Sequence, residues 1–136
     1  YNKGDIPNIF EKFNKNIKRL VKILDSNIVN NIQIDTLKRR LFIVIKDSPI
    51  IILQHAGEYI FKYKEFIIDN KLDDLLQKDL LYFDDVDKTS EQEVGQLFNL
   101  IKDLWKDIGD DEKKYINKIF KSLLSEYSKY KSINCR

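Results

Sequence analysis

The residues best suited to covalent chemistry are His55 and Cys135, the only histidine and the only cysteine of the chain. A nucleophilic triad needs a base beside its serine or cysteine, so any such site would depend on His55. Cys135 is followed by a single residue, and His55 has Ile52 and Tyr59 at helical spacing on either side. One histidine and one cysteine also cannot supply the three or four ligands of a zinc site. We therefore expect no catalytic residue, no metal site and no enzymatic activity.

An acidic run past the middle of the chain superficially resembles a calcium-binding loop. Asp85, Asp87 and Thr89 alternate as the first three ligands of such a loop do. The position that requires glycine is Ser90, however, and the position that requires a bidentate glutamate is Gln96. The chain also has neither of the common glycine-rich phosphate loops. We therefore expect a solvated acidic loop and no cofactor.

The densest basic cluster, formed by Lys38, Arg39 and Arg40, could contact phosphate groups. It precedes Asp47-Ser48-Pro49, which could be the turn of a helix-turn-helix motif. Residues 69–93 nevertheless contain three lysines against nine acidic residues, a net charge of −6 that disfavours nucleic acid across them. A nucleic-acid-associated helical protein that uses this cluster is therefore the alternative function, and a solvated helix face is the favoured interpretation.

Four aromatic residues stand close together in the middle of the chain, and helical geometry cannot point all of them at one core. They are Tyr59, Phe61, Tyr63 and Phe66. Some of these rings could therefore lie on the surface. With Trp105 they could form the apolar centre of a partner-binding patch, because tyrosine and tryptophan are enriched at the centres of protein interfaces. Burial beneath the acidic segment is the other interpretation, and it stays open. We expect a protein partner to bind at or near Tyr59, Tyr63, Phe66 and Trp105.

The first half of the chain shows helical periodicity almost throughout. Apolar residues recur every three or four positions from Pro7 to Leu24, which predicts an amphipathic helix. A second helix is predicted over Ile32–Lys46. Ser48-Pro49 suits the cap and first position of a third helix that continues to Ile67. Within it, Ala56-Gly57 permits either the close approach of another backbone or a kink.

The second half begins with the acidic segment, where we expect a short helix and then an ordered loop over residues 80–83. Ser90 and Glu93 form a capping box for a strong amphipathic helix. Gly109 is placed to end that helix in the left-handed conformation. A last helix follows, with an apolar face that runs from Tyr115 to Tyr130.

These elements predict an all-α fold, a compact bundle of five to six helices with an acidic, partly irregular segment around residues 69–89. With 136 residues and 43% apolar composition, residues 1–136 can form a single domain around one core. The chain begins with Tyr1, so a fragment of a longer protein is also compatible. The longest apolar run, Pro49–Leu53, is too short to span a membrane. A lone cysteine favours a reducing, intracellular environment.

Three segments carry a resemblance to known proteins: Leu37–Pro49, Ala56–Glu65, and Ile101–Ile108 leading through Asp111-Glu112-Lys113 to the last helix. Their order resembles small helical proteins of unknown function encoded by giant double-stranded DNA viruses. The resemblance implies a viral protein in the host cytoplasm or the virion, and it implies no activity or site residue. We therefore expect a non-enzymatic protein–protein interaction or structural module with a protein partner, and homo-oligomerisation is also open.

Overall fold

The computed structural model describes residues 3–27, 32–77 and 91–134. These ranges contain α-helices and 3-10 turns and no β-strand, which confirms the predicted all-α fold. They contain seven α-helices, one more than the upper prediction, because the third predicted helix is divided in two. The helices are α1 (Ile6–Asn27), α2 (Ile32–Asp47), α3 (Pro49–Lys62), α4 (Lys64–Ile68), α5 (Leu72–Gln77), α6 (Glu91–Leu104) and α7 (Asp110–Asn134), with 3-10 turns η1 (Lys3–Asp5) and η3 (Trp105–Asp107).

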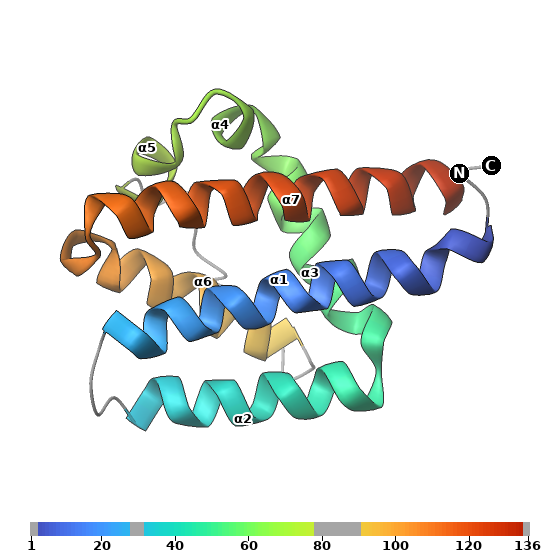
Figure 1. The fold of residues 1–136 in the computed structure, drawn as a ribbon, viewed down its shortest axis with the longest axis horizontal. Coiled ribbons are helices and arrows are strands. Elements are labelled where there is room, and N and C mark those ends of the chain that lie inside the picture. Colours follow the sequence, from blue (N-terminus) through green and yellow to red (C-terminus); the bar gives the residue numbers. More distant parts are fainter. Residues whose placement is uncertain (1–2, 28–31, 78–90, 135–136) are drawn as a thin grey trace.

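Helices α1 and α7 lie side by side and run in opposite directions, and theirs is the most extensive contact between two helices (Figure 1). Helix α3 crosses both of them, and α2 packs against α1 and α3. Helix α6 contacts α2 on one side and α3 on the other. The short helices α4 and α5 lie over the α7 side of the bundle (Figure 1). The core therefore lies among α1, α2, α3, α6 and α7.

The stripe that predicted α1 is the face that α1 buries. Phe13, Ile17, Leu20 and Leu24 are all inaccessible to solvent. Full burial of a large apolar side chain contributes about 1.5–3 kcal/mol relative to exposure. The periodicity of the first helix is thus explained by its packing against α7 and α3.

The junction of α2 and α3 lies where the sequence predicted it. The Ser48 N–H donates to the Val44 carbonyl at 2.8 Å, and α3 begins at Pro49. The expected cap by the Ser48 side chain is wrong, because the Ser48 backbone carbonyl itself accepts the Ile51 N–H at 3.1 Å. Buried Asn14 of α1 donates its Nδ2 to the Pro49 carbonyl at 2.9 Å, so α1 anchors this junction.

Helix α3 continues through Gly57, and the division from α4 occurs at Tyr63. There the Tyr63 N–H donates to the Ile60 carbonyl at 3.2 Å, an i→i+3 bond that tightens the end of the helix. The helix has no break at Gly57, and the neighbour that approaches there is a side chain, not the predicted backbone. A Cβ atom on Gly57 would overlap the ring of Tyr127 on α7, so this glycine marks a helix contact.

Helix α5 lies in the acidic segment, where a short helix was predicted. The predicted loop at residues 80–83 and the capping residue Ser90 lie outside the described residues. The prediction for Gly109 is wrong, because no glycine in the described ranges has a positive φ. The Gly109 carbonyl accepts the Lys113 N–H at 2.9 Å. Gly109 therefore precedes α7, which begins at Asp110, and α6 has already ended at Leu104.

Candidate functional site

The residues with nucleophilic or metal-binding chemistry do not converge in the described structure. His55 lies on α3 and is half-buried, and Cys135 lies outside the described residues. Within residues 3–27, 32–77 and 91–134, no three histidine, cysteine or acidic side chains gather closely enough to hold a metal ion. His55 therefore lies on α3 outside any cluster of potential metal ligands among the described residues.

Three of the four residues predicted to bind a partner form a row of rings. The Tyr59 and Tyr63 ring centres are 5.2 Å apart, and those of Tyr63 and Phe66 are 6.5 Å apart, both with edge-on geometry. Tyr59 also stacks on fully buried Phe98 of α6 at 5.4 Å. All three residues of the row are half-buried. They pack against the core from its edge, so they are partly structural.

Trp105 does not join that row on a common exposed surface. Trp105 is the first residue of the 3-10 turn η3, and it is only 3% exposed. The indole N–H donates to the Asp73 carboxylate of α5. The Lys113 ammonium lies 5.3 Å from the ring centre, within range of a cation–π interaction. Burial and these two contacts fix Trp105 between α5 and the start of α7.

The predicted basic cluster is spread around α2. Lys38 forms an ion pair with Asp25 of α1 at 3.4 Å. Arg39 is exposed, and Arg40 lines a groove between α2 and α6. Consecutive helical residues are about 100° apart around the axis, which accounts for this divergence. The structure therefore does not bring the three side chains together into one phosphate-binding face.

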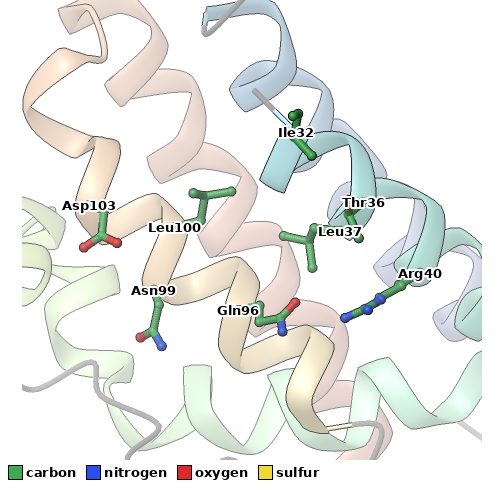
Figure 2. A pocket seen from close by; sticks show the side chains of 8 residues that line it. All are labelled: Ile32, Thr36, Leu37, Arg40, Gln96, Asn99, Leu100 and Asp103. Atoms are coloured by element: carbon green, nitrogen blue, oxygen red, sulfur yellow. The ribbon is translucent and has the colours of Figure 1, made fainter. Parts of the chain in front are cut away.

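A groove of about 400 Å³ lies between α2 and α6, which line it from either side (Figure 2). Leu37 and Leu100 point toward one another across its floor and are 3% and 8% exposed. Ile32 stands at the rim and is 79% exposed. Polar side chains complete the lining, and they are Thr36, Arg40, Gln96, Asn99 and Asp103.

The two charges of the groove lie at opposite ends of its lining (Figure 2). Arg40 extends from α2 toward Gln96, and Asp103 lies at the far end on α6. Neither charged group makes an ion pair with another described residue. The groove therefore presents an apolar floor between one unpaired cation and one unpaired anion.

Sequence reasoning missed the α6 wall of this groove. Gln96, Leu100 and Asp103 recur at four and three residues on one helix face, opposite the face that buries Phe98. That spacing was visible in the sequence. The position of α2 across from it was not, because the two helices are far apart along the chain.

Tyr59 supplies a pH-dependent test of the packing around the aromatic row. Burial, and secondarily the nearby Tyr63, raise the pKa of Tyr59 above its usual value. The unfolded chain therefore loses this proton first, from about pH 10 upward, and the folded state binds more protons there. We expect the free energy of unfolding to fall as the pH rises above about 10, and this group to have no effect below.

The measurement is urea unfolding at pH 9 and pH 11. Tyr59→Phe should lose less stability between the two pH values than the wild type does. Tyr115→Phe is the matched control, because Tyr115 is 47% exposed, and it should retain the wild-type loss. Equal losses in all three proteins would show that Tyr59 does not keep its proton in the fold.

Among the described helices, none combines the length and the apolar character needed to cross a membrane. No protein-family model, curated protein or solved structure matches the chain.

Proposed function

We propose that this protein is a non-enzymatic interaction module that binds an amphipathic helix of a partner protein in the α2–α6 groove. The observation that carries the proposal is the groove itself, with its apolar floor, its exposed rim residue Ile32 and its two unpaired charges. Amphipathic helices bind such grooves through apolar residues spaced three and four apart. The aromatic row is a weaker candidate because its rings are partly used in the core.

The charges of the groove define the chemistry of the partner helix. Gln96 is beside Arg40, and seven residues of α6 separate it from Asp103, a rise of about 10.5 Å. A helix lying along the groove spans the same length in seven residues. The partner therefore carries an acidic residue opposite Arg40, a basic residue seven positions away opposite Asp103, and apolar residues between them.

The source of the protein belongs to the same proposal. The resemblance of three segments to proteins of giant DNA viruses supports a viral origin, with the partner met in the host cytoplasm or the virion. Mass spectrometry of infected cells and of purified virions tests this part. Absence of the chain from both, across a full infection cycle, would contradict it.

The binding mode is tested with two synthetic helical peptides and an exchange of the groove charges. Both peptides carry the same apolar stripe, and the lysine and glutamate seven residues apart change places between them. Exposed ion pairs contribute up to about 1 kcal/mol each, and mispaired charges repel. We therefore expect the wild type to bind the matched peptide about tenfold more tightly than the exchanged one.

The protein variant Arg40→Glu/Asp103→Arg should reverse that preference and bind the exchanged peptide more tightly. Amide signals of α2 and α6 should shift on binding in heteronuclear NMR spectra. A lack of preference between the peptides, shifts confined to Tyr59, Tyr63 and Phe66, or a self-associated dimer that occupies the groove would each overturn the proposal.

A further inference from the structure

A second concave surface lies between the α4–α5 turn and the first half of α7. It encloses about 420 Å³ and shares no residue with the α2–α6 groove. Asn70, Leu72, Asp73 and Trp105 form one wall. The other wall is provided by α7 and consists of Lys113, Lys114, Asn117, Lys118 and Lys121.

The charge of this cavity is strongly positive. Four lysines line it against one carboxylate, Asp73, which already accepts the Trp105 indole N–H. Exposed Lys114, Lys118 and Lys121 make no ion pair with any described residue. Three ammonium groups that repel one another and share no counter-charge favour the binding of an anion with more than one charge.

A fixed pair of amides adds a neutral donor to the cavity. Asn117 donates its Nδ2 to the Asn70 Oδ1 at 2.6 Å. Asn70 has a φ of 58°, the left-handed conformation that asparagine tolerates better than most residues. With its Oδ1 engaged, the Asn70 side chain offers its own Nδ2 group, which has no partner in the described ranges. The Asn70 amide therefore adds a hydrogen-bond donor to the lysine charges, and the Asn117 Oδ1 beside it is a buried acceptor without a partner among the described residues.

We propose that this cavity is a binding site for a diphosphate group, either free or as part of a nucleotide. Lys114 and Lys121 are seven residues apart on α7, a rise of about 10.5 Å, with Lys118 between them, so the three ammonium groups can surround two linked phosphates. Lysine binds phosphate as a point charge through its three N–H donors. Exposed Asp110 and Asp111 end the basic row on α7, which disfavours an extended nucleic acid along it.

Trp105 makes binding observable, because it is the only tryptophan of the chain and lines the cavity beneath the Lys113 ammonium. Titration of the whole chain with inorganic pyrophosphate at low salt should change the tryptophan fluorescence with saturation. The affinity should fall as salt is added, because exposed charges are screened. ADP and inorganic pyrophosphate are compared to distinguish a nucleotide from a free diphosphate as the source.

The deciding variants are Lys118→Glu/Lys121→Glu and a control with the same net charge, Lys12→Glu/Lys46→Glu, on exposed positions of α1 and α2. We expect the first to weaken pyrophosphate binding by about tenfold or more and the control to change it less than about threefold. Circular dichroism checks that both variants are folded. Equal weakening in both variants, no saturable binding by the wild type, or tighter binding of a single-stranded oligonucleotide than of pyrophosphate would overturn the proposal.

Discussion

Replacement of Gly57 by alanine is expected to destabilise the fold by about 2 kcal/mol, although alanine favours helices by about 1 kcal/mol over glycine. The added methyl group would overlap the ring of Tyr127. That ring is 5% exposed and packs 6.0 Å from Phe61 and 6.2 Å from Tyr130, measured between ring centres, so it has little room to move. Urea unfolding monitored by circular dichroism measures the loss.

Gly109→Ala is the matched control, because a Cβ atom there meets only the flexible end of the Glu112 side chain. Its cost should stay below about 1 kcal/mol, the range of a weakened helix start. Tyr127→Leu should make Gly57→Ala less harmful, with a coupling energy of about 1 kcal/mol or more in a double-mutant cycle. Additive effects of the two changes would show that Gly57 and Tyr127 do not meet.

The helices themselves were predictable because their signals are local. The apolar stripe of α1 and the Ser48-Pro49 restart each act within a few residues, and the structure has both helices at those places. Gly57 was recognised as a special position, but its role depends on Tyr127, seventy residues away. Tertiary packing therefore decides whether Gly57 marks a close contact or a kink.

The candidate sites were less predictable for the same reason. Trp105 has the residue type of an interface, yet its N–H is satisfied by Asp73 from another helix. The α2–α6 groove combines Arg40, which the sequence indicates as part of a basic cluster, with Asp103, for which the sequence gives no prediction. Residue type indicated which side chains could bind. Only the packing of helices distant in the chain shows which of them remain available.

Phe98→Ala is expected to destabilise the protein most, by about 3–5 kcal/mol. Phe98 is inaccessible to solvent and links three helices, with ring centres 5.4 Å from Tyr59 of α3 and 5.8 Å from Phe120 of α7. Its removal leaves a cavity that rigid aromatic neighbours cannot fill. Because domains of this size have about 5–15 kcal/mol of stability, thermal and urea unfolding should both show a large loss.

Phe42→Ala removes the same atoms from a different setting and should cost less than about 1 kcal/mol. Phe42 is 36% exposed on α2, and the Lys18 and Lys38 ammonium groups lie 5.3 and 5.9 Å from its ring centre. Similar losses for the two variants would contradict the placement of α6 against the core.

Phe98 points away from the α2–α6 groove, so the folded fraction of Phe98→Ala should still bind the matched helical peptide. If peptide binding by Phe98→Ala falls only as much as its folded fraction falls, the role of α6 in the core is separate from its role in recognition. A larger loss of binding would show that the two roles depend on the same residue.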